Sequence, residues 1–254
     1  MNRRFRGILF DMDGVLYHGS QRLAGVLEFF TVLELPYRFV TNNSSRTPTQ
    51  VLERLHNMEI PATVEQILTS ALVAADYLHR TAPPAAKVYV VGEVGLRTAL
   101  IDEGFRLTDD QPDYVVVGLD RAFDEAKLTT AVTAIRNGAS FIATNMDRVL
   151  MNETGSQPGT GTIVDRIAEA SGQTPLVMGK PERPMFEMAA VQMALALEDL
   201  LMIGDNLETD ILGAKRAGIT AALVLTGVTK RADLVTSPVQ PDLVLENLLD
   251  LLKS

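Results

Sequence analysis

Short apolar runs alternate with amphipathic stretches along this 254-residue chain. The apolar runs are rich in β-branched residues and lack polar alternation, which is typical of strands covered on both faces. They occupy residues 5–10, 37–41, 87–91, 114–118, 140–144, 200–204 and 221–225. Helical patterns lie between them at residues 25–34, 48–57, 64–79, 124–137, 161–171, 184–196 and 208–217. This alternation predicts an α/β fold with a largely parallel sheet.

Two segments rich in proline, glycine and small residues, 79–87 and 171–184, stand out from this alternation. Such segments are typical of linkers between domains. The block between them, at roughly 95 residues, is long enough to form a small domain of its own. We therefore expect a second α/β domain inserted into the first.

Composition and charge narrow the classes of partner. Hydrophobic residues make up 46% of the chain and charged residues 22%, which is ordinary for a globular protein. The net charge of −9 argues against general nucleic-acid binding, which needs a basic surface. No apolar run reaches the roughly 18 to 20 residues needed to span a bilayer, and the basic N-terminal residues do not lead into a signal peptide. We expect a cytoplasmic protein with neither a nucleic-acid nor a membrane partner.

The chain contains no cysteine, which excludes disulfides, thiolate catalysis and cysteine-ligated metals. Its three histidines, at 18, 56 and 79, are far apart in the sequence, so a zinc site rich in histidine is not expected. A metal cofactor would instead be a hard cation held by oxygen atoms, such as Mg²⁺.

Two aspartates, Asp11 and Asp13, follow the first apolar run in the stretch DMDGVL. Two carboxylates this close repel each other unless a cation lies between them, and one could act as a nucleophile while the other transfers a proton. A solvated surface turn is the simpler alternative. A calcium loop is excluded, because Val15 and Arg22 occupy positions that such a loop fills with oxygen ligands.

Three further polar clusters lie close to predicted strands. The segment 41–45 (TNNSS) directly follows one strand, and its hydroxyl and backbone N–H groups suit phosphate oxygens. Lys180, in a tight loop after apolar residues, could neutralise an anion. Asp205 and Asp210 follow another strand in GDNLETD, where carboxylates can hold a hard cation. Each cluster taken alone has a simpler explanation. The segment 41–45 could be a polar turn, Lys180 a solvated surface lysine, and Asp205 a helix cap.

Together, the four clusters resemble the motifs of the haloacid dehalogenase (HAD) superfamily of phosphohydrolases. They stand in the family order as DMDGVL, FVTNNS, GKP and GDNLETD, and the resemblance spans at least residues 5–227. It implies a Rossmann-like parallel-sheet HAD core with an inserted α/β cap domain.

Spacing favours the NagD-type or 4-nitrophenylphosphatase-like subfamily, in which a large cap lies between the second and third motifs. Thr41 follows Asp11 by 30 residues, which is too few for a cap, whereas Lys180 follows Thr41 by 139 residues. The stretches ATNMD and PGTGTIVDRIAEASG also resemble this group. We expect residues 1–79 and 178–254 to form the catalytic core, and residues 80–177 to form the cap that determines substrate specificity.

The resemblance implies a Mg²⁺-dependent phosphomonoester hydrolase that forms an aspartyl-phosphate. Asp11 would be the nucleophile and Asp13 the general acid and base. The metal would be held by Asp11, the backbone carbonyl of Asp13 and Asp205. Asp210 and Asn206 would not be direct metal ligands but would hold those ligands in position.

Thr41, Asn42 and Lys180 would then hold the phosphoryl oxygens, with Asn42 acting through its backbone N–H. Substrate specificity would depend on side chains near the leaving group, although a plain surface role is equally open for them. The candidates are Asn145, Asp147, Arg148 and His18.

Several alternatives stay open at the level of sequence. A phosphotransferase or phosphomutase, or a non-catalytic protein that binds a phosphate ligand, could share this fold. The partner is expected to be a small-molecule phosphate ester, such as a sugar phosphate, phosphoglycolate, pyridoxal phosphate or a nucleotide. A homodimer formed through the cap is a further possibility.

Overall fold

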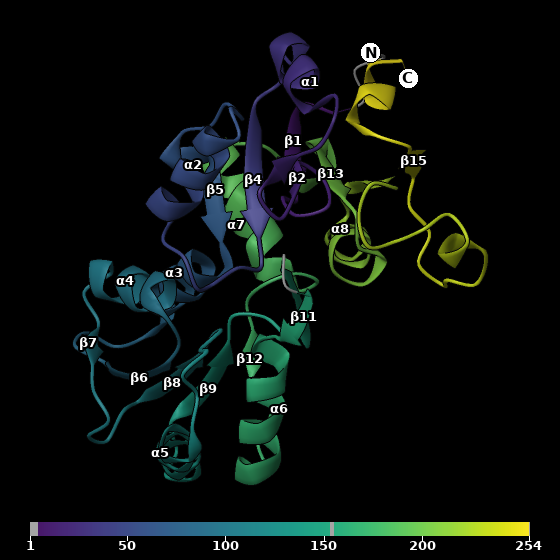
Figure 1. Ribbon diagram of the computed structural model, residues 1–254. Helices are drawn as coiled ribbons and strands as arrows, with labels where there is room; N and C mark the ends of the chain where they lie inside the picture. Colours follow the sequence, from purple (N-terminus) through teal and green to yellow (C-terminus); the bar gives the residue numbers. More distant parts are fainter. Residues whose placement is uncertain (1–4, 153–154, 254) are drawn as a thin grey trace. The chain divides into compact units, whose positions relative to one another are not determined.

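The computed structural model describes residues 5–152 and 155–253 (Figure 1). The chain divides into two compact units, and the residues of each unit mainly contact one another. Unit 1 comprises Met1–Thr41, Val51–Leu68 and Lys180–Ser254, and unit 2 comprises Asn42–Gln50 and Thr69–Gly179. This division places residues 42–50 and 69–79 with the inserted unit, whereas the sequence analysis placed them in the core. The expected domain bounds stay a prediction.

Unit 1 is built on a six-stranded sheet with the order β15, β14, β13, β1, β4, β5. The strands are Gly7–Phe10 (β1), Tyr37–Thr41 (β4), Ile67–Thr69 (β5), Leu200–Gly204 (β13), Thr220–Val224 (β14) and Leu243–Leu245 (β15). The paired strands from β4 to β15 run parallel, so the carboxyl ends of β1, β4 and β13 share one edge. A two-stranded ribbon, Tyr17–His18 (β2) and Gln21–Arg22 (β3), follows β1.

Helices and short turns connect these strands. The helices are Val26–Val32 (α1), Pro48–Asn57 (α2), Arg183–Met193 (α7) and Leu212–Ala217 (α8), and α2 begins in the first segment of unit 2. A π-helical turn spans Leu207–Ile211 (η3), and 3₁₀ turns span Val64–Gln66 (η1), Leu197–Asp199 (η2), Asp233–Val235 (η4) and Leu248–Lys253 (η5).

Unit 2 is built on a five-stranded parallel sheet with the order β12, β9, β8, β6, β7. The strands are Lys87–Val91 (β6), Arg106–Leu107 (β7), Tyr114–Val117 (β8), Ser140–Ala143 (β9) and Leu176–Val177 (β12). An antiparallel hairpin joins Val149–Asn152 (β10) and Gly155–Pro158 (β11). The helices are Ser70–Thr81 (α3), Val94–Asp102 (α4), Glu125–Arg136 (α5) and Thr160–Ser171 (α6).

The predicted α/β class with parallel sheets is confirmed, and each predicted strand lies close to its expected position. The single helix predicted over 64–79 is wrong. The capping box of Thr63 and Gln66 closes only the short turn η1, after which Ile67 and Leu68 are buried in the edge strand β5. Helix α3 then begins after Thr69, whose side chain accepts a hydrogen bond from the Leu72 N–H.

None of the helices in the described parts of the chain is long and apolar enough to cross a membrane. The longest of them, α3, α5 and α6, have 12 residues each, against the roughly 20 that a bilayer requires. The cytoplasmic location stays a prediction.

An aromatic cluster fixes the end of β1 in the core of unit 1. Phe10, the last residue of β1, contacts Phe29, Phe30, Tyr37 and Phe39, with ring centroids 5.4 to 6.2 Å apart. Phe10, Phe29 and Phe39 are fully buried. Because these rings join β1, α1 and β4, they pack together the two strands whose ends carry Asp11 and Thr41.

Replacing Phe29 with alanine removes the ring that packs edge-on against Phe10. We expect Phe29→Ala to lower the free energy of unfolding by about 3–5 kcal/mol, because it leaves a cavity in a packed core. Urea unfolding followed by circular dichroism measures this loss. The control Val191→Ala, at a side chain 80% exposed, should change the value by no more than about 0.5 kcal/mol. Equal effects of the two substitutions would contradict the central role of the cluster.

Candidate active site

Three strands of unit 1, β13, β1 and β4, are neighbours in the sheet (Figure 1). Predicted site residues lie at their carboxyl ends. Asp11 follows β1, Thr41 ends β4 and Asp205 follows β13. Since β1 pairs with both β4 and β13, the sheet brings these three positions to one edge. Ligands bind at this edge in open parallel α/β sheets.

Lys180 is the buried centre of the site, with only 2% of its surface exposed. Its Nζ lies 2.5 Å from Asp11 Oδ1 and 2.7 Å from Asp210 Oδ1, and it also donates to the Val40 carbonyl at 3.2 Å. Burial alone would lower the pKa of Lys180, but the two carboxylates outweigh it and raise the pKa above its ordinary value. The lysine therefore stays protonated.

Carboxylates outnumber the lysine in this cluster. Oxygen atoms of Asp11, Asp205 and Asp210 lie within 4.8 Å of one another, close enough to share a metal ion. Burial and repulsion by Asp210 raise the pKa of Asp205 to about 7, and burial also raises the pKa of Asp11 despite the attraction of Lys180. When ionised, three carboxylates against one ammonium leave two negative charges. This donor set and its charge fit a divalent cation such as Mg²⁺.

Asp205 is held in place by a loop that follows β14. The Val228 N–H donates to Asp205 Oδ2 at 2.6 Å, and the Thr229 N–H donates to the Asp205 carbonyl at 3.1 Å. Gly14 and Gly227 press against the same side chain, because a Cβ on either would overlap Asp205 Oδ2. The sequence analysis missed this loop, although a glycine soon after a buried strand is a signal of close backbone approach.

Asp210 holds the backbone of Asp205 and Asn206 in position. Its Oδ2 accepts hydrogen bonds from the backbone N–H groups of Asp205 (3.2 Å) and Asn206 (3.1 Å), while its Oδ1 faces Lys180. The side chain of Asn206 instead accepts from the Glu208 N–H at 2.9 Å and caps the turn η3. Asp210 thus joins the lysine to the backbone that carries Asp205.

Asp13 lies at the exposed edge of the site, and burial of part of its side chain raises its pKa, opposed by Arg54 and His18. His18 Nδ1 is 3.7 Å from Asp13 Oδ1, and His18 Nε2 lies 2.6 Å from the Thr226 carbonyl. The Arg54 guanidinium lies 4.7 Å from the centre of the Tyr17 ring. His18 thus stands beside the proposed proton donor, and its contact with substrate stays a prediction.

The other predicted residues lie in unit 2. Asn145 is buried and donates to the Asn42 carbonyl at 2.8 Å, and the Asp147 carboxylate accepts from the Asn42 side chain. Arg148 is exposed, and its Nε donates to Asp165 at 2.8 Å. The structure therefore joins Asn145 and Asp147 to Asn42 and leaves Arg148 on the surface. Contact of these side chains with a leaving group stays a prediction.

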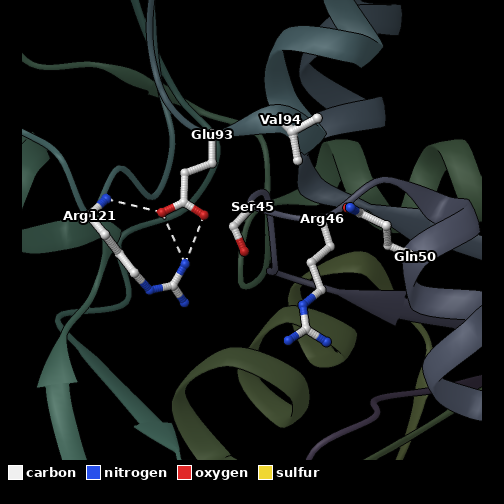
Figure 2. Close-up of a pocket in the computed structure, with 6 residues that line it drawn as sticks. All are labelled: Ser45, Arg46, Gln50, Glu93, Val94 and Arg121. Carbon is white, nitrogen blue, oxygen red and sulfur yellow. Dashed lines mark hydrogen bonds and ion pairs between the residues drawn. The ribbon is translucent and has the colours of Figure 1, made fainter.

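Unit 2 also contains a polar pocket of about 450 Å³, which the sequence analysis missed (Figure 2). One wall is the Arg121 guanidinium against the Glu93 carboxylate, with a shortest distance of 2.7 Å. The pocket is lined by Ser45, Arg46, Gln50, Glu93, Val94 and Arg121. Two of its lining residues pack closely against Gly95, because the Gly95 N–H donates to the Ser45 carbonyl and a Cβ on Gly95 would overlap the Arg46 backbone.

Comparisons with known proteins show which family the chain is similar to. The profile of the haloacid dehalogenase-like hydrolases matches residues 8–106, and a second HAD hydrolase-like profile matches residues 177–251. The chain is 38% identical to the 5′-nucleotidase YutF of Bacillus subtilis over 98% of each chain. Among solved structures, it resembles NagD of Escherichia coli K-12, with a TM-score of 0.89, 33% identity and coverage of 96% of this chain and 97% of NagD.

A second solved structure bears on the metal. The glycerol phosphate phosphatase of Mycobacterium tuberculosis, determined in complex with magnesium, matches with a TM-score of 0.92 and 34% identity. The match covers 98% of this chain and 76% of that protein.

The loop after β14 can be tested through Gly227. We expect Gly227→Ala to weaken Mg²⁺ binding about 10- to 100-fold, because its Cβ would displace the Asp205 carboxylate. Calorimetric titration with Mg²⁺ measures the affinity without relying on turnover. The control Val228→Ala keeps the N–H that holds Asp205 and removes only an exposed side chain, so it should bind Mg²⁺ as the wild type does. Unchanged affinity in Gly227→Ala would show that the loop does not position Asp205.

Proposed function

The chain belongs to the haloacid dehalogenase-like hydrolase family and is a phosphatase acting on phosphate esters, and from this premise we propose that it is a Mg²⁺-dependent phosphomonoesterase with an aspartyl-phosphate intermediate. The observation that carries the proposal is the buried cluster in which Lys180 contacts Asp11 and Asp210 beside Asp205. Asp11, the proposed nucleophile, and Lys180, the proposed positive charge for a phosphoryl oxygen, lie together at the edge of the sheet where ligands bind in such folds.

The residues that would hold Mg²⁺ are Asp11 and Asp205, together with the backbone carbonyl of Asp13. Their support comes from the oxygen donors and the surplus negative charge of the cluster, and from the magnesium complex of the related glycerol phosphate phosphatase. When bound, the cation supplies charge neutralisation for the phosphoryl oxygens.

Asp11 acts as the nucleophile in the first step. One of its carboxylate oxygens attacks phosphorus as the bond from phosphorus to the ester oxygen breaks. Asp13, whose raised pKa favours a protonated carboxyl, gives its proton to the departing alkoxide. In the second step Asp13 takes a proton from the water that attacks the aspartyl-phosphate, which releases inorganic phosphate and restores Asp11.

The remaining residues position the phosphoryl group. Lys180 stays protonated and offers a fixed positive charge, while Thr41 and the Asn42 N–H supply hydrogen-bond donors at the end of β4. Phosphoryl transfer depends mainly on such positioning and charge neutralisation. The proposed substrate is a small phosphorylated metabolite. Because the relatives are named for different substrates, the leaving group must be identified by experiment.

A panel of phosphate esters tests the function. We expect Mg²⁺-dependent release of inorganic phosphate from at least one member of a set that includes a sugar phosphate, phosphoglycolate, pyridoxal phosphate, a nucleoside monophosphate, glycerol phosphate and 4-nitrophenyl phosphate. Excess EDTA should abolish the release, and added Mg²⁺ should restore it. Inactivity on every ester with Mg²⁺ present would favour the non-catalytic binder, and phosphate transfer to a sugar in place of water would favour a phosphotransferase.

The two aspartates of the first cluster should separate in their effects. Asp11→Asn should reduce turnover by more than about 1,000-fold, because it removes the nucleophile. Asp13→Asn should lower kcat about 10²- to 10⁴-fold while leaving KM close to the wild-type value, because it removes the proton donor but little of the binding site. The exposed control Asp102→Asn should match the wild type. Wild-type phosphate release by Asp11→Asn would refute the assignment of the nucleophile.

A further inference from the structure

Asn42 stands where the chain passes from unit 1 into unit 2, one residue after Thr41 at the end of β4. Its main-chain carbonyl accepts hydrogen bonds from Asn145 Nδ2 at 2.8 Å and from Ser70 Oγ at 2.7 Å. Its side-chain amide donates to both oxygens of the Asp147 carboxylate, at 3.1 and 3.3 Å. Both the backbone and the side chain of Asn42 are therefore held by unit 2.

Asn145 and Asp147 also brace each other. The Asp147 N–H donates to Asn145 Oδ1 at 3.1 Å, and Asn145 Nδ2 lies 3.3 Å from Thr144 Oγ1. Asn145 is 2% exposed, so its amide group is fixed by burial as well as by hydrogen bonds. We call Asn42, Asn145 and Asp147 the clasp.

The chain leaves unit 2 at the same place. Gly179 is the last residue of unit 2, and a Cβ added to it would lie 2.5 Å from both Asn42 Oδ1 and the Thr144 carbonyl. The two crossings of the chain, from Thr41 to Asn42 and from Gly179 to Lys180, therefore meet at the clasp. Thr41 and Lys180, the residues on the unit 1 side of these crossings, are both proposed to hold the phosphoryl group.

The chemistry of the clasp suits orientation. A carboxylate that accepts two hydrogen bonds from one amide fixes which way that amide points, and its charge strengthens both bonds. The adjacent Arg148 pairs with Asp165. Because the Asn42 carbonyl and side chain are both held, the clasp fixes the Asn42 Cα and with it the position of the backbone nitrogen that follows Thr41.

We propose that Asp147, braced by Asn145, is a positioning residue of the phosphatase reaction: it orients Asn42 and thereby the phosphate-binding backbone at the end of β4. This inference rests on the proposed function. Asp147 contacts neither substrate nor phosphate in this role, so its loss acts through Asn42. A displacement of about 1 Å in a binding group can reduce the rate about 100-fold.

The first test compares two substitutions at Asp147. Asp147→Ala removes both acceptors of the Asn42 amide, whereas Asp147→Asn retains one. We expect Asp147→Ala to raise KM and the inhibition constant of inorganic phosphate about 10- to 100-fold and Asp147→Asn to raise them less than Asp147→Ala, with Mg²⁺ affinity unchanged in both. Glu169→Gln, at an exposed carboxylate of α6 in the same unit, is the control and should leave all three constants unaltered.

The second test exchanges the partners. Asn42→Asp places a carboxylate against Asp147 and should impair phosphate binding strongly. Adding Asp147→Asn restores one donor and one acceptor, and the double variant should recover at least part of the loss. Such a recovery measures direct coupling between the two side chains. Additive losses in the double variant would overturn the proposal.

Thermal denaturation separates positioning from a purely structural role. If Asp147→Ala melts earlier but keeps the wild-type KM and phosphate inhibition constant, the clasp serves stability alone and the proposal is wrong. Should Asp147→Ala fail to fold, Asp147→Asn and the double variant decide the matter. An active wild type with an unaffected Asp147→Ala would overturn this inference only, whereas a wild type inactive on every ester would overturn the proposed function as well.

Discussion

The buried contact of Lys180 with Asp11 and Asp210 is the constraint on which the site depends. These residues come from the end of β1, the loop before α7 and the turn η3, which are far apart in the sequence. A buried charge that loses its partner costs about 3–5 kcal/mol, so the three segments must meet as unit 1 folds. The proposed catalytic cluster is therefore part of the buried interior of unit 1 and not an addition to its surface.

The same cluster is poised for an anion and a cation together. Burial and mutual repulsion raise the pKa of Asp11 and Asp205, whereas the pKa of Lys180 moves upward under the influence of the carboxylates. Groups so arranged favour a ligand that relieves the repulsion, and a cation near Asp205 would do so. In the proposed reaction the phosphoryl group would be held by both the lysine and the cation. The electrostatics of the site and its proposed chemistry thus have one cause, the crowding of three carboxylates around one ammonium.

Sequence patterns predicted the strands whose own residues are apolar and buried on both faces. The strand at Gly7–Phe10 is apolar on both faces, and the carboxylates that follow it were recognisable because charge is out of place at the end of such a strand. Contacts set by tertiary structure were beyond prediction. The edge strand Ile67–Thr69 is too short to interrupt a helical pattern, and the support that Val228 gives Asp205 joins residues 23 positions apart in separate loops. The role of a glycine such as Gly227 depends on the neighbour pressed against it.

Asn145 and Asp147 show why residue type alone does not determine a role. From the sequence, a surface position and a contact with the leaving group are equally plausible for them. In both cases the side chain would interact with solvent or substrate and not with another residue of the chain. Their partner is Asn42, more than 100 positions earlier in the chain. A cation in place of Asp147 could not accept from the Asn42 amide, and it would add a positive charge near the proposed phosphate site. A carboxylate instead orients the amide and adds no positive charge, so Lys180 stays the protonated side chain that we propose for the phosphoryl group.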